Sequence, residues 1–116
     1  MISEPVTDAW VCVTPQSNIP LREGRAIQLG GHEIAIFNLG DRVLALANRC
    51  PHRGGPLSDG LLADGVVVCP LHAWKVALAS GNVERPAGRE ACVATYAARL
   101  ENGLIYVALP RPQAAA

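Results

Sequence analysis

Short apolar runs separated by turn residues dominate the chain. Runs of Val, Ile, Leu and Ala alternate with Gly, Asn, Asp and Pro at intervals of roughly eight to twelve residues, and helix signals are scarce. This spacing predicts an all-β, antiparallel sandwich or barrel. The expected strands cover residues 9–14, 25–29, 32–39, 42–47, 66–68, 74–78, 91–100 and 104–109.

Turn residues separate several of these runs. Gly30-Gly31, Gly40-Asp41 and Asn102-Gly103 accept positive φ at little cost, so they predict tight hairpins. Between residues 48 and 66 the alternation fails, and Pro and Gly crowd into one long loop; residues 80–90 form a second irregular stretch. Long irregular loops in a small domain are usually functional.

The length of the chain limits the number of domains that it can form. The chain has 116 residues and a mass of 12.2 kDa, which fits a single domain spanning residues 1–116 with no second catalytic lobe. We expect an ordered core over about residues 8–109 and a mobile tail at 110–116, where periodicity is absent.

The charge balance and the hydropathy of the chain exclude some classes of binding partner. Lys plus Arg number 10 and Asp plus Glu number 10, so the formal net charge is zero, which argues against nucleic acid or an anionic membrane as a partner. There is no apolar run of the roughly 18 residues that a membrane span needs, and residues 1–5 lack a signal-peptide pattern. We therefore expect a cytoplasmic protein, where cysteines are more often metal ligands, catalytic groups or core residues than disulfides.

Two Cys-His pairs carry the candidate chemistry. Cys50 and His52 open the long loop, and Cys69 and His72 follow the 66–68 run. Each pair offers one thiolate and one imidazole, and the prolines that follow each cysteine stiffen both loops. This quartet predicts a metal site formed by two loops.

The interleaving of the ligands decides between metals. Zinc accepts two Cys and two His, but its finger motifs usually keep the Cys together and place the His on a helix. A Rieske-type 2Fe-2S centre needs two Cys on one iron and two His on the other, and each loop supplies one residue to each iron. The pattern favours the iron-sulfur cluster, and a zinc-stabilised interaction module without a redox role remains an alternative.

Here the sequence resembles the Rieske family. Residues 50–60 read CPHRGGPLSDG and residues 69–81 read CPLHAWKVALASG. The second stretch, with Trp74 two positions after the second His, is most similar to the small subunit of assimilatory NAD(P)H-dependent nitrite reductase. The resemblance implies a Rieske-type sandwich or barrel with a two-loop cluster-binding subdomain at one tip.

The resemblance also implies a role. Cys50 and Cys69 would hold one iron and His52 and His72 the other, in a subunit that passes single electrons to a large subunit bearing FAD, a 4Fe-4S cluster and sirohaem, which reduces nitrite to ammonia in nitrate assimilation. A stand-alone Rieske ferredoxin that serves an aromatic-ring dioxygenase is an alternative. The sequence shows no Ser-His-Asp set and no paired acid and base, so we expect a non-catalytic electron-transfer subunit.

The chain departs from the respiratory Rieske proteins. Those proteins carry one further Cys in each cluster loop, joined as a disulfide, where this sequence has Gly55 and Leu71. They also place Ser where this chain has Trp74. The stabilising disulfide of those proteins is therefore absent from this sequence.

The remaining marked residues receive simpler interpretations. Cys12 and Cys92 lie in apolar runs and are expected to be small buried hydrophobic residues, and Trp10 is expected in the core. His32 follows a turn and is expected on the surface. Three cations flank the ligands and could form a docking patch for a redox partner; they are Arg49, Arg53 and Lys75.

Overall fold

The computed structural model describes residues 9–50, 55–63, 65–71, 73–86 and 92–109. The predicted tail at 110–116 lies outside this part of the chain, as do His52, Arg53 and His72.

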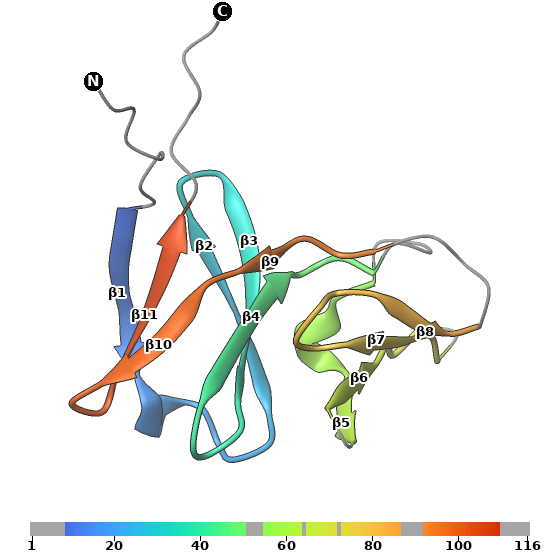
Figure 1. The fold of residues 1–116 in the computed structure, drawn as a ribbon, viewed down its shortest axis with the longest axis horizontal. Coiled ribbons are helices and arrows are strands. Elements are labelled where there is room, and N and C mark those ends of the chain that lie inside the picture. The colour runs from blue at the N-terminus through green and yellow to red at the C-terminus, as the bar shows by residue number, and fades with distance from the viewer. Residues whose placement is uncertain (1–8, 51–54, 64, 72, 87–91, 110–116) are drawn as a thin grey trace, which may run out of the picture.

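Antiparallel strands form three small sheets (Figure 1). The first sheet has the order β1-β11-β10, with β1 (Ala9–Pro15), β11 (Leu104–Leu109) and β10 (Ala98–Glu101). The second has the order β2-β3-β4-β9, with β2 (Gly24–Leu29), β3 (His32–Asn38), β4 (Val43–Ala47) and β9 (Thr95–Tyr96). The third has the order β5-β6-β7-β8, with β5 (Leu61–Ala63), β6 (Val66–Val68), β7 (Lys75–Ala77) and β8 (Val83–Arg85). The predicted all-β antiparallel fold is confirmed.

Two short 3-10 helices complete the described elements. The first, η1 (Gln16–Asn18), follows β1, and the second, η2 (Leu57–Asp59), precedes β5. No helix in the described part of the chain is long and apolar enough to cross a membrane.

The second sheet is the middle layer, and β3 is buried on both faces. Ile34 and Ile36 point to one side, toward β11, whereas Ala35 and Phe37 point to the other, toward the third sheet. Successive side chains of a strand alternate between faces, so one strand serves two cores.

The two cores have different makeup. The barrel core, between the first and second sheets, contains Ile19, Ile34, Ile36, Val43, Ala45, Ile105 and Val107. The cluster-side core, between the second and third sheets, contains Ala35, Phe37, Leu46, Cys50, Leu57, Val67, Cys69, Val76, Leu78, Val83 and Val93. Both cysteines of the predicted metal site therefore belong to the second core.

The turns agree with the sequence. Gly30 and Gly31 link β2 to β3 with φ of 52° and 83°, and Asn102 and Gly103 link β10 to β11 with φ of 54° and 77°. Gly40, between β3 and β4, has a φ of 91°. Backbone of this kind favours glycine and asparagine, which is why these dipeptides mark hairpins.

The strand prediction needs three corrections. The run at 91–100 contains two separate strands, β9 and β10, and the described residues include β5 and β8, which were expected to be loop. These two strands have three residues each, too few to show an alternation in the sequence. The fit is better elsewhere, because β2, β6 and β11 lie within one residue of their expected bounds.

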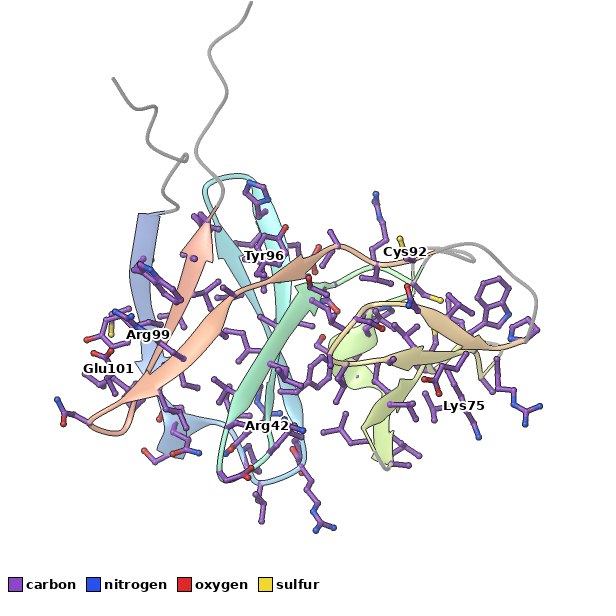
Figure 2. All side chains as sticks on the ribbon, viewed as in Figure 1. Arg42, Lys75, Cys92, Tyr96, Arg99 and Glu101 are labelled. Atoms are coloured by element: carbon purple, nitrogen blue, oxygen red, sulfur yellow. The ribbon has the colours of Figure 1, made fainter. Side chains whose placement is uncertain are left out.

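Three residues expected to be buried are exposed. Trp10 is 42% exposed and lies beneath the guanidinium of Arg99, 4.3 Å from its ring centroid. Cys12, on the same outward face of β1, is an exposed free thiol. Cys92, whose backbone forms a β-bridge with Asn82, is also an exposed free thiol (Figure 2). In β1 every position from 10 to 13 is apolar or Cys, so the sequence does not show which alternate set faces the core.

Candidate metal centre

The middle layer and the small third sheet bring two cysteines together. Cys50 lies just after the end of β4, and Cys69 directly follows β6. Each side chain is only 2% exposed. Residues nineteen positions apart in sequence thus share one buried place because β4 and β6 end at the same side of the cluster-side core.

The two thiols lie near enough in one core for Cys50 to affect the protonation of Cys69. Burial raises the pKa of the Cys69 thiol above its ordinary value, and a hydrogen bond and the charge of the neighbouring Cys50 thiol raise it further. The backbone N–H of Leu71 lies 3.4 Å from Cys69 Sγ and opposes this rise, because it stabilises the thiolate. Two adjacent sulfurs with a backbone donor aimed at one of them match the thiolate half of a metal site.

Backbone hydrogen bonds shape the loop around each sulfur. The Cys50 N–H donates to the Gly55 carbonyl at 2.8 Å, so these two residues of the first loop lie side by side. The Cys69 N–H donates to the Trp74 carbonyl at 2.7 Å, and the Ala73 N–H donates to the Cys69 carbonyl at 3.2 Å. Ala73 adopts a φ of 58°, so the second loop also turns back tightly.

Gly55 and Leu71 pack directly against each other beside the sulfurs. A Cβ built on Gly55 would lie 3.0 Å from Cys69 Sγ and 3.0 Å from Leu71 Cδ1, closer than ordinary contact. Glycine at 55 therefore lets the two loops approach. An apolar contact therefore joins the two loops beside the sulfurs.

The described residues fit the thiolate half of an iron-sulfur site. Two cysteines buried in one core, a backbone donor and a close-packed glycine form a cradle that an added side chain would fill. His52 and His72 lie outside the described residues, so the imidazole half remains a prediction from the sequence.

The structure also places the other aromatic, histidine and basic residues that the sequence marked. Trp74 is partly buried and packs against the core that holds both cysteines. His32, expected on the surface, is half-buried, and its Nδ1 lies 2.9 Å from Tyr96 Oη in a hydrogen bond. Arg49 and Lys75 are exposed beside the loops.

Sequence reasoning missed one polar residue at the site. Asn48, two positions before Cys50, is buried and hydrogen-bonds to both Glu33 and Ser58. The only signal in the sequence is an asparagine at the end of an apolar strand, which by itself indicates a turn.

Comparisons with known proteins identify the family of this site. Residues 9–97 match the model of the Rieske 2Fe-2S domain. The chain is 34% identical over 101 residues to the ferredoxin subunit of 3-phenylpropionate/cinnamic acid dioxygenase of Escherichia coli K12, covering 85% of this chain and 92% of the relative.

Two further similarities point toward nitrite reductase. The chain is 33% identical over 103 residues to the large subunit of NAD(P)H nitrite reductase of Klebsiella oxytoca, covering 84% of this chain and 11% of that protein. A solved structure from Mycobacterium tuberculosis, described as an NADH-dependent nitrite reductase small subunit, superposes with a TM-score of 0.80 at 25% identity, covering 90% of this chain and 98% of that one.

Proposed function

Because this chain belongs to the Rieske 2Fe-2S family, we propose that four side chains of its two irregular loops ligate the 2Fe-2S cluster that such a domain binds. They are Cys50, His52, Cys69 and His72. The observation that carries the thiolate half is that Cys50 and Cys69 are both buried in the same core, beside each other's loops. When bound, the cluster would supply one-electron transfer. The two buried cysteines would hold one iron away from water, and the two loops would present the cluster to a partner.

The partner follows from the second loop and the comparisons. We propose that the chain is the small subunit of an NAD(P)H-dependent nitrite reductase and exchanges electrons with a large subunit that reduces nitrite to ammonia. The stretch at 69–81 with Trp74, the superposition with the Mycobacterium tuberculosis structure and the match to the Klebsiella oxytoca protein support this assignment.

One observation favours a second candidate. The dioxygenase ferredoxin subunit is 34% identical over nearly its whole length, so the chain could equally serve as a ferredoxin for an aromatic-ring oxygenase. Both functions use the same cluster and differ only in the protein that docks against it.

Cysteine substitutions test the ligand assignment. Cys50→Ser or Cys69→Ser should remove the visible absorption and the EPR signal of the reduced cluster. Cys12→Ser and Cys92→Ser are matched controls, because both thiols are exposed and free, and they should leave the spectra unchanged. Spectra lost in a control variant, or stoichiometric zinc in a colourless wild-type protein, would contradict the assignment.

A reconstitution experiment separates the two partners. The purified holoprotein is mixed either with the nitrite reductase large subunit from the same cell or with an aromatic-ring dioxygenase and its reductase. Nitrite-dependent NAD(P)H oxidation that requires this chain supports the first function. Oxygenation that requires this chain, without any effect on nitrite reduction, would replace the first proposal with the second.

A further inference from the structure

Asn48 is a buried polar residue at the start of the first cluster loop, and the fold alone does not explain it. It is 5% exposed and follows β4, two positions before the proposed ligand Cys50. Burying an amide costs free energy unless its hydrogen bonds are made, so its partners show what the residue does.

The Asn48 side chain ties the first cluster loop at both of its ends. Its Oδ1 accepts a buried hydrogen bond of 2.7 Å from the Ser58 N–H, at the far end of the loop. Its Nδ2 donates to Glu33 Oε2 at 3.1 Å, and its backbone N–H donates to the Glu33 carbonyl at 3.0 Å. One residue therefore joins the beginning of the loop, the end of the loop and strand β3.

A second tie is nested inside the first. The Cys50 N–H donates to the Gly55 carbonyl at 2.8 Å, so the loop is closed once at residues 48 and 58 and again at residues 50 and 55. The outer closure fixes where the inner one sits relative to β3. Its loss would release the backbone that carries Cys50, while the strands on either side keep their pairing.

We infer that Asn48 is a positioning residue for the cluster: its side chain clamps residues 48 and 58 together against β3 and so fixes the place of Cys50. The inference rests on the proposed role of Cys50 as a ligand. It concerns the geometry of that ligand, and Asn48 itself does not touch the metal.

The barrel side supplies a matched comparison residue. Asn38, at the end of β3, is 6% exposed and also bridges distant backbone. Its Nδ2 donates to the Ile19 carbonyl at 2.7 Å, and its Oδ1 accepts from the Gly40 N–H at 2.9 Å and from Gln16 at 2.9 Å. Asn38 therefore has the same chemistry and burial as Asn48, but it holds loops next to the barrel core.

The experiment compares Asn48→Ala with Asn38→Ala in the holoprotein. Both variants leave buried partners unsatisfied and should lower the thermal midpoint. Only Asn48→Ala should alter the EPR g values and the visible circular dichroism of the cluster, and it should speed cluster loss to a chelator by about tenfold, the factor expected for one buried hydrogen bond. Glu33→Ala removes only the exposed side-chain partner and should have a smaller effect on both spectra.

Distinct outcomes decide the inference. Equal spectra in Asn48→Ala and the wild type, or equal spectral changes in both alanine variants, would overturn it. If Asn48→Ala does not fold, the double variant Asn48→Asp/Glu33→Gln keeps the acceptor for Ser58 and exchanges donor and acceptor between positions 48 and 33, so that no like charges meet. Its g values should then stay near those of the wild type, and a shift as large as that of a Cys50 loop mutation would contradict the clamp. A wild-type protein without a Rieske spectrum would instead refute the ligand proposal itself.

Discussion

The barrel core and the cluster-side core share the middle sheet, but they are built differently. The buried residues of the barrel core are all aliphatic, and its strands are four to seven residues long except for the two-residue β9. The cluster-side core includes two cysteines and relies on strands of three residues joined by irregular loops. Short strands with few paired residues contribute little stability on their own. We conclude that the barrel is the scaffold, and that the cluster side depends on close loop packing and on its cofactor.

The largest expected loss of stability comes from substituting two neighbouring residues of β3. Phe37 faces the cluster-side core and Ile36 faces the barrel core, and both are fully buried. Phe37→Ala should cost about 3–5 kcal/mol and Ile36→Ala about 2–5 kcal/mol of unfolding free energy. Urea unfolding should show both losses, whereas only Phe37→Ala should hasten cluster loss. If the two variants lose the cluster at the same rate, the stability of the cluster site depends equally on both cores.

Two glycines with nearly the same backbone test the packing difference. Gly81, between β7 and β8, has a φ of 79°, and Gly31, in the barrel hairpin, has a φ of 83°. A Cβ at Gly81 would collide with the Val93 carbonyl, whereas a Cβ at Gly31 would meet nothing within 4 Å. Gly31→Ala should therefore cost only the left-handed strain of about 1–2 kcal/mol.

Gly81→Ala should add an overpacking cost of about 1–3 kcal/mol to that strain. Thermal and urea unfolding of the two variants measure the difference. If both variants lose the same free energy of unfolding, the cluster side accommodates an added methyl group as easily as the open hairpin does. Close packing would then not be what stabilises the loops.

Charge reversals sharpen the comparison on the surface. Arg49 is exposed and follows β4 on the cluster side. Lys75 is exposed at the start of β7, and Arg42 is exposed at the opposite end of β4, in the turn after β3 (Figure 2). If the cluster side is the docking face, Arg49→Glu and Lys75→Glu should each slow electron transfer several-fold, up to about tenfold, at low salt. Arg42→Glu is the matched control and should have little effect.

Salt dependence distinguishes steering from damage. The Arg49→Glu and Lys75→Glu defects should shrink as ionic strength rises, because screening at about 0.15 M acts over about 8 Å. Stopped-flow rates with the partner, measured with unchanged cluster spectra, provide the check. A defect of equal size in Arg42→Glu would remove the distinction between the two surfaces.

The same comparison explains what the sequence could predict. Turn dipeptides and the long strands were predictable because each depends on neighbours close in sequence. The Cys-His quartet is also a local pattern, but only its two cysteines lie in the described residues, so the role of the quartet stays a prediction. The outward direction of Trp10 and Cys12 was not readable, because β1 has apolar side chains on both faces and only contact with β11 selects between them.

The clamp at Asn48 was hidden for a similar reason. Its partners lie ten and fifteen positions away, and no local pattern links an asparagine to Ser58 or Glu33. Likewise, β5 and β8 exist because β6 and β7 offer them an edge to pair with. These features of the cluster side, like the outward face of β1, depend on contacts distant in sequence, which is why the sequence did not predict them.

The smallest expected effect belongs to the barrel side. Tyr96 is half-buried, packs against the barrel core, and its Oη is hydrogen-bonded to His32. The two rings meet edge to face with centroids 5.6 Å apart. Tyr96→Phe keeps the ring contact and removes the hydroxyl, so it should cost about 1 kcal/mol at neutral pH and leave the cluster spectra unchanged.

The pH dependence of stability checks the cause. Burial raises the pKa of Tyr96 above the ordinary value of 10.0, so the fold favours the protonated phenol. Its contribution to stability is therefore complete below pH 10 and is lost as pH rises through the raised folded-state pKa. Tyr96→Phe cannot ionise here, so its unfolding free energy should fall less steeply between neutral and strongly alkaline pH than that of the wild type. Parallel alkaline slopes in urea titrations would show that the Tyr96 phenol is as well solvated in the folded barrel as in the unfolded chain.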